Sequence, residues 1–78
     1  MPTILRIKGY RFFFFSLDRE EPIHVHVEKG EGYAKFWMRP LALARSRGFQ
    51  KRELHEIRKL IERHGMTIEE KWHEYFGE

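Results

Sequence analysis

The hydrophobic pattern of the chain changes its period near residue 40, and this change limits the possible folds more than any other feature. Up to Met38, aromatic and β-branched residues alternate with polar ones, and glycine, proline or aspartate interrupts them at short intervals. A period of two is typical of strands that bury one face. The pattern predicts strands over residues 3–7, 10–16, 23–28 and 33–38, with a glycine-rich turn between the last two.

Beyond residue 40 the spacing becomes helical. Pro40 can open a short helical segment over residues 40–46, which Gly48 would end. The main helix is predicted over residues 51–64, because its apolar residues recur at the spacing of one helix face. This predicted buried stripe consists of Leu54, Ile57, Leu60 and Ile61.

A second helix should follow the main one closely. Gly65 is suited to end the main helix in a left-handed conformation. Thr67 and Glu70 have the spacing of a capping box, which predicts a last helix that starts there and continues through Phe76. Together these elements predict an α+β fold in a single domain of residues 1–78. We expect an antiparallel sheet of three to four strands with two to three helices packed on one face.

Length and composition exclude several classes of protein. A chain of 78 residues has room for one domain. The absence of cysteine excludes disulfides and thiolate metal sites, which fits a cytoplasmic protein. No apolar run approaches the roughly 18–20 residues that span a bilayer, and basic residues interrupt the start of the chain. We therefore expect neither a membrane span nor a signal segment.

Phe13 and Phe15 lie on the opposite side of their predicted strand from Phe12 and Phe14. If the helices cover only one face of the sheet, these two rings would be left in the open. An exposed aromatic patch is typical of an interface, so we expect Phe13 and Phe15 to contact a partner protein or a second copy of the chain. The alternative is that residues 40–46 fold back over them.

His24 and His26 form the motif most open to a chemical interpretation. Strand periodicity places both imidazoles and Glu28 on one face, with the two histidine Cβ atoms about 6.5–7 Å apart. One ring could serve as general acid or base in phosphodiester cleavage by a metal-independent endoribonuclease, with Glu28 orienting it and no cofactor. Alternatively, the pair could hold a metal ion together with Glu28. A third interpretation is that both rings are structural, hydrogen-bonded to neighbours across the sheet.

The charges are segregated along the chain. No acidic residue occurs between Gly32 and Arg52, a stretch with six basic residues, whereas glutamates predominate from Glu53 onward. The six are Lys35, Arg39, Arg45, Arg47, Lys51 and Arg52. Such a stretch near a helix N-terminus favours phosphate and nucleic-acid binding, and interleaved aromatic residues permit base stacking. The alternative is an ordinary solvated rim, paired with glutamates of the helices.

Five segments of the sequence carry a resemblance to a known family. They are MPTILRI at residues 1–7, GYRFFF at 9–14, PIHVHVE at 22–28, AKFW at 34–37 and WHEYF at 72–76. In this combination the chain resembles the DUF4160 family of small prokaryotic domains of unknown function. Ile23 and Gln50 depart from the family pattern, which usually has a second proline and a serine there.

The resemblance implies a role in a pair of small proteins. Such genes are often found beside another short gene of unknown function, in an arrangement similar to a type II toxin–antitoxin module. The resemblance implies a toxin-like or regulatory member with a small cognate protein partner and nucleic acid as its target, and it supplies no catalytic residues. The alternative function is a non-enzymatic interaction module that acts through a partner or as a homodimer.

Overall fold

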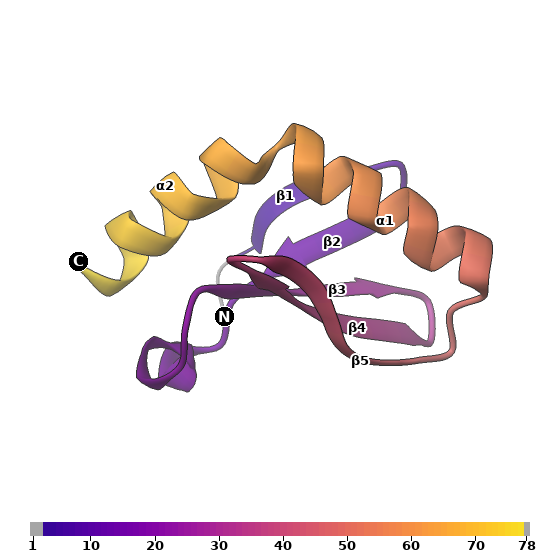
Figure 1. The fold of residues 1–78 in the computed structure, drawn as a ribbon, viewed down its shortest axis with the longest axis horizontal. Coiled ribbons are helices and arrows are strands. Elements are labelled where there is room, and N and C mark those ends of the chain that lie inside the picture. The colour runs from indigo at the N-terminus through magenta and orange to yellow at the C-terminus, as the bar shows by residue number, and fades with distance from the viewer. Residues whose placement is uncertain (1–2, 78) are drawn as a thin grey trace.

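A five-stranded antiparallel sheet forms the centre of the structure, a computed structural model that describes residues 3–77. Each strand pairs with the next along the chain, in the order β1-β2-β3-β4-β5 (Figure 1). The elements are β1 (Thr3–Ile7), β2 (Tyr10–Phe13), a 3₁₀ helix η1 (Ser16–Glu20), β3 (His24–Lys29), β4 (Gly32–Met38), β5 (Leu41–Arg47), α1 (Lys51–Arg63) and α2 (Gly65–Phe76).

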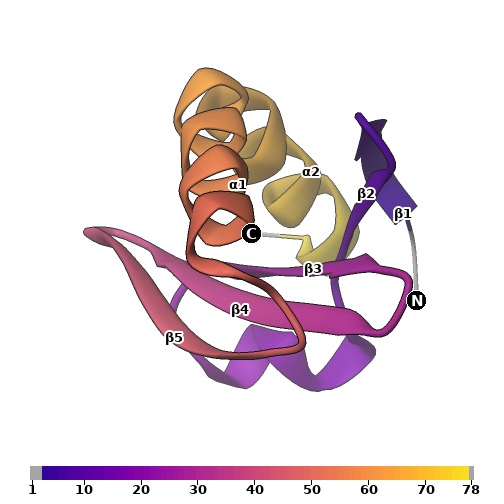
Figure 2. The same ribbon diagram turned by 90° about the vertical axis from the view of Figure 1, so that its right-hand side faces the viewer.

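The two α-helices lie on one side of the sheet and η1 lies on the other (Figure 2). This arrangement confirms the predicted α+β class and the antiparallel sheet with helices on one face, although the strand count is higher than expected. We call the side that carries η1 the open face. Within residues 3–77, none of the helices is long and apolar enough to cross a membrane.

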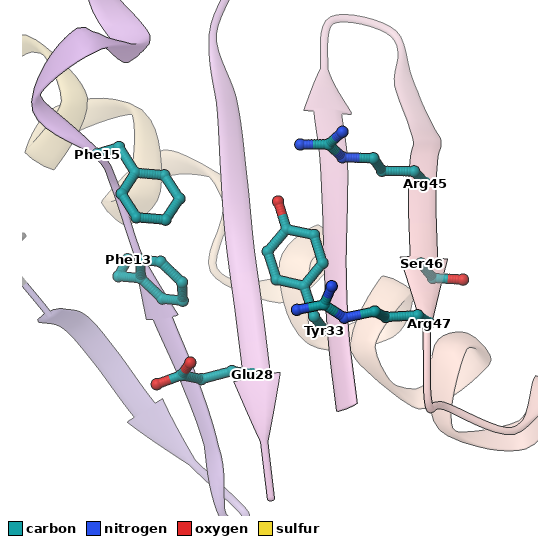
Figure 3. Close-up of a pocket in the computed structure, with 7 residues that line it drawn as sticks. All are labelled: Phe13, Phe15, Glu28, Tyr33, Arg45, Ser46 and Arg47. Carbon is teal, nitrogen blue, oxygen red and sulfur yellow. The ribbon is translucent and has the colours of Figure 1, made fainter. Parts of the chain in front are cut away.

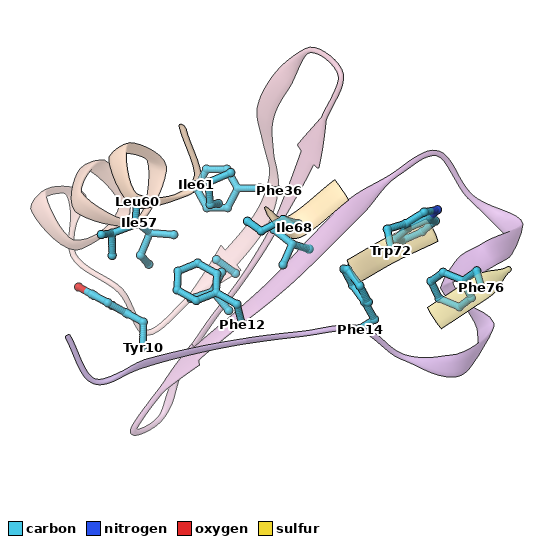
Figure 4. Close-up of a cluster of buried hydrophobic side chains, with 13 residues drawn as sticks. Tyr10, Phe12, Phe14, Phe36, Ile57, Leu60, Ile61, Ile68, Trp72 and Phe76 are labelled. Atoms are coloured by element: carbon cyan, nitrogen blue, oxygen red, sulfur yellow. The ribbon is translucent and has the colours of Figure 1, made fainter. Parts of the chain in front are cut away.

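The core fills the space between the sheet and the two α-helices (Figure 4). The alternation in the strands places Phe12, Val25 and Phe36 on the helix side, where each is at most 1% exposed. The predicted stripe of the main helix supplies three buried residues, and α2 supplies Trp72 and two others. These helical residues are Ile57, Leu60, Ile61, Ile68, Trp72 and Phe76. The period-two and helical patterns of the sequence therefore meet in one core.

The short helix predicted over residues 40–46 is wrong, because this segment forms the edge strand β5. Leu41 and Leu43 pair with Met38 and Phe36 of β4, so their side chains continue the apolar helix side of the sheet. An irregularity in the register between Lys35 and Phe36 accommodates the extra residue on β5. Sheet pairing outweighs the weak helical pattern of this segment, and it raises the strand count to five.

Two predicted boundaries also differ. The second strand ends at Phe13 instead of continuing to residue 16, because the chain turns into η1. The last helix begins at Gly65 and not at the expected capping box, so Thr67 lies inside the first turn of α2. His64, with φ −107° and ψ 17°, forms the break between the helices. Gly65 is therefore not the left-handed terminator that the sequence predicted.

Candidate functional site

His24 and His26 lie on the open face of β3, as their spacing predicts, but both rings are buried. His24 is 0% exposed and His26 is 3% exposed, because aromatic rings pack around them and η1 lies over this end of the open face. Their ring centroids are 4.9 Å apart. An imidazole covered in this way cannot touch a phosphodiester from solvent unless η1 moves aside. Their predicted role in cleavage thus has no support in this geometry.

Asp18 of η1 is the acidic group that contacts both rings. Its Oδ2 atom accepts a hydrogen bond of 2.7 Å from the backbone N–H of Phe15, which fixes the carboxylate on the first turn of η1. The same oxygen lies 3.0 Å from Nε2 of His26, and Oδ1 lies 3.0 Å from Nε2 of His24. The carboxylate therefore lies against both histidines of β3 and is hydrogen-bonded to His26. We call Asp18, His24 and His26 the histidine–aspartate cluster.

The Nδ1 nitrogen of each ring has a hydrogen-bond partner. Nδ1 of His24 donates to the backbone oxygen of Pro22 at 2.9 Å, since a carbonyl can only accept. Nδ1 of His26 lies 2.8 Å from the hydroxyl of Tyr33. Burial lowers the pKa of His26 below its ordinary 6.5, and the opposing attraction of Asp18 does not outweigh this effect. The His26 ring is therefore neutral near pH 7.

Glu28, the third member of the predicted acid–base site, does not join the cluster. Its Oε1 atom instead accepts a hydrogen bond of 2.7 Å from Nη1 of Arg11 on the neighbouring strand. Within the described part of the chain, no hydrogen bond or ion pair links Glu28 to either imidazole. The carboxylate that orients the rings is Asp18, and Glu28 faces a separate hollow.

That hollow is a cavity of about 460 Å³ on the open face, beside the histidine–aspartate cluster. Figure 3 shows Phe13 and Phe15 on one side and Arg45 and Arg47 on the other, with Tyr33 between them. The guanidinium carbons of Arg45 and Arg47 lie 5.9 and 5.3 Å from the centroid of the Tyr33 ring. An aromatic ring flanked by two cations can bind an anionic, planar ligand. We call this hollow the aromatic–arginine pocket.

The other four residues of the basic stretch lie elsewhere. Lys35 donates to Glu21 at 2.7 Å. Arg39 donates to Glu69 of α2 at 3.0 Å, and this hydrogen bond lowers the pKa of the Glu69 carboxyl. Lys51 and Arg52 are exposed at the start of α1. The basic stretch is thus divided between two arginines in the pocket, two ion-paired residues and the helix start.

The two phenylalanines of the predicted interface differ in exposure. Phe13 is 2% exposed, because Arg11 lies 4.4 Å above its ring and His26 stacks on it at 5.4 Å. Phe15 is 39% exposed. Neither the predicted partner nor the fold-back of residues 40–46 is needed to bury Phe13. Only Phe15 remains accessible for the contact that the sequence predicts.

Comparison with known protein families gives one match. A family described as Domain of unknown function (DUF4160) matches residues 9–73. The chain belongs to the DUF4160 family. Neither the curated proteins nor the solved structures contain a match to it.

The matched region of this DUF4160 chain contains both the cluster and the pocket, including the residue that sequence reasoning missed. Asp18 lies in a polar loop, outside every periodic segment, so no spacing rule connects it to His24. Its one local signal is its place three residues after Phe15, where a short polar side chain can turn back to bond the backbone. That signal predicts a turn and says nothing about the histidines.

Proposed function

We propose that the chain binds single-stranded nucleic acid, RNA above all, in the aromatic–arginine pocket on the open face of the sheet. The single observation that carries the proposal is the placement of Tyr33 between Arg45 and Arg47. Base stacking on aromatic rings with arginines at the backbone is the usual way in which a sheet surface binds single strands. Phe15 adds a second accessible ring on the other side of the pocket.

The spacing of the two arginines supports contacts to separate phosphates. Arg45 and Arg47 are two residues apart on β5, so their Cα atoms are about 6.5–7 Å apart and their side chains share one face. No acidic side chain is paired with either guanidinium within residues 3–77, whereas Glu28 at the far side is neutralised by Arg11. The arginine side of the pocket is therefore the side that favours phosphate.

In this proposal the activity is binding rather than cleavage. His24 and His26 are covered by η1, so they cannot exchange protons with a bound strand. The earlier expectation of an endoribonuclease would require a conformation in which Asp18 and η1 move away from β3. Intact RNA after prolonged incubation with the purified protein is the result that we expect.

A role as the toxin-like or regulatory member of a gene pair remains part of the proposal. It comes from the family resemblance, and RNA binding is compatible with it. Expression of the chain alone and together with the neighbouring gene product, with growth as the readout, tests this role. Equal growth in both cases would contradict it without bearing on RNA binding itself.

Fluorescence anisotropy with a labelled single-stranded RNA oligonucleotide tests the binding site. The double variant Arg45→Gln/Arg47→Gln should lose affinity, because it removes both cations from the pocket. The matched control Lys51→Gln/Arg52→Gln removes the same charge from the start of α1 and should bind nearly as well as the wild type. Equal losses in the two variants, or no binding by the wild type, would refute the proposed site.

One observation favours the alternative function as a protein-interaction module. Phe15 directly precedes η1 and is 39% exposed, and Leu17 in its first turn is 74% exposed. Exposed apolar side chains close together are typical of a protein contact. Light scattering of the wild type and of the double variant Phe15→Ser/Leu17→Ser distinguishes the two functions. A wild-type dimer that the variant abolishes would support the interaction module, and two monomers would argue against a homodimer there.

A further inference from the structure

The histidine–aspartate cluster brings three metal-binding side chains to one buried point. One ligand atom from each of Asp18, His24 and His26 lies within 4.8 Å of the other two. All three residues are more than nine-tenths buried, and two different elements supply them. Two imidazole nitrogens and a carboxylate oxygen are donors that zinc and its neighbours among the transition metals accept. Nothing in the proposed function uses this point of the molecule.

The bonding of His24 points to a missing cation. Its Nδ1 atom carries the proton that is donated to Pro22, so in the neutral ring Nε2 is a bare lone pair. This Nε2 is buried and has no hydrogen-bond partner among residues 3–77, although Oδ1 of Asp18 lies 3.0 Å from it. In a neutral ring this lone pair would face the carboxylate oxygen with no proton between them. A positive ion bound by both atoms would replace that repulsion with two bonds.

We propose that Asp18, His24 and His26 bind a divalent transition-metal ion, Zn²⁺ or one of similar chemistry. Metal-binding histidines usually donate their second nitrogen to a carbonyl or another oxygen, which fixes the ring and the tautomer. Here the carbonyl of Pro22 and the hydroxyl of Tyr33 are already in those places. Both rings are therefore held with Nε2 turned toward Asp18, and metal binding would move the His26 proton from Nε2 to Nδ1, where the Tyr33 hydroxyl can accept it.

The three ligand atoms are close together but must approach further to hold an ion. Zinc bonds of about 2.0–2.1 Å in a tetrahedral arrangement set neighbouring ligand atoms about 3.3 Å apart. The 3.0 Å separations join different oxygens of Asp18, Oδ1 to Nε2 of His24 and Oδ2 to Nε2 of His26, and one ligand atom from each residue lies within 4.8 Å of the others. Rotation of the carboxylate and a shift of η1 toward β3 would close the set around the ion. Glu21, whose Oε1 lies 3.8 Å from Nε2 of His24, is the nearest further carboxylate on the solvent side.

The position of the cluster indicates what the ion does. Structural zinc sites usually have four ligands, so a fourth, with Glu21 the nearest carboxylate, would complete the three of the cluster. The cluster is buried and its ligands join η1 to β3. The ion would fix η1 over one end of the open face, next to Phe15 and the aromatic–arginine pocket. This is a structural metal site, distinct from the nucleic-acid site.

Equilibrium dialysis and thermal unfolding with Zn²⁺ alone test the site, using untagged protein that has first been stripped with a chelator. The wild type should bind one equivalent and its Tm should rise. Asp18→Asn and His24→Gln should each abolish both effects, whereas His55→Gln, an exposed histidine on α1, should leave them intact. Tyr33→Phe removes the hydroxyl behind His26 and should weaken the affinity by about 10–100-fold.

Three results would overturn the proposal. They are no stoichiometric binding by the wild type, binding that survives both Asp18→Asn and His24→Gln, and an equal loss in His55→Gln, which would indicate a surface site. If His24→Gln does not fold, Asp18→Asn decides, because the amide retains the acceptor for the Phe15 N–H. Anisotropy with RNA in the presence of chelator measures the nucleic-acid site separately, so failure of one proposal is not failure of the other.

Discussion

Replacement of Asp18 by asparagine should leave the metal-free protein about as stable as the wild type, although it removes a buried carboxylate. The amide oxygen can take the place of Oδ2, where it accepts from the Phe15 N–H and from Nε2 of His26. The amide nitrogen then takes the place of Oδ1 and can turn to donate to the unpartnered Nε2 of His24. The substitution thus replaces a repulsive contact with a hydrogen bond.

Replacement of Asp18 by alanine should cost much more stability. It leaves the buried Nε2–H of His26 and the partly buried N–H of Phe15 without their acceptor. An unsatisfied buried donor costs about 1–3 kcal/mol, and water can replace part of the second bond, so Asp18→Ala should lose about 2–4 kcal/mol. A chain of 78 residues has a free energy of unfolding of about 4–12 kcal/mol at the usual value per residue. Alanine should therefore remove a large part of the free energy of unfolding. Asparagine should change it by less than about 1 kcal/mol.

Urea unfolding in the presence of a chelator, followed by circular dichroism, measures both variants against the wild type. Similar denaturation midpoints for Asp18→Asn and the wild type, with a much lower midpoint for Asp18→Ala, are expected. A loss in Asp18→Asn as large as that in Asp18→Ala would refute the reasoning. It would show that the carboxylate stabilises the metal-free protein through its contact with His24, and that no further cation is needed there.

Two other properties follow from the structure. Burial and a hydrogen bond of 2.9 Å to Glu56 raise the pKa of Tyr10 to about 12. The native state therefore keeps this proton after the unfolded state has lost it near pH 10, so stability is full below pH 10 and falls as the pH rises to about 12. An ultraviolet titration should show a tyrosine that ionises only near pH 12, and Tyr10→Phe should abolish this late step; a wild type without the late step would contradict this. A Cβ at Gly32 would overlap the ring of Phe49, so Gly32→Ala should cost about 1–3 kcal/mol in thermal unfolding. Gly65 lies in a helix with open space around it, so Gly65→Ala should instead raise the free energy of unfolding by about 0.4–1 kcal/mol. If Gly32→Ala were the more stable of the two variants, the contacts of the added Cβ would not determine their stability.

The alternation of the sequence predicted much of the sheet. The strand period correctly placed Phe12 with the core and His24 beside His26 on the other face, because side-chain direction in a strand follows from position alone. The predicted bounds of the main helix were correct to within one residue, since its apolar stripe is long and regular. These features depend on the spacing of neighbouring residues, which can be taken directly from the sequence.

The parts that sequence reasoning missed depend on contacts between distant segments. Residues 41–47 have only a weak helical pattern of their own, and pairing with β4 makes them a strand. The same pairing brings Arg45 and Arg47 to Tyr33, so the pocket could not be assembled from charge segregation alone. Asp18 reaches β3 through a turn whose path no periodicity encodes.

The salt dependence of RNA binding tests the central claim most directly. For a single strand, each phosphate neutralised by the protein contributes about −0.7 to the slope of log K against log salt concentration, where K is the binding constant. Two such contacts, from Arg45 and Arg47, predict a slope of about −1.4 from the pocket. A fourfold rise in salt should then weaken binding about sevenfold. The Arg47→Gln variant should lose about half of this slope. A flat response in the wild type, or the same slope in both proteins, would contradict the account.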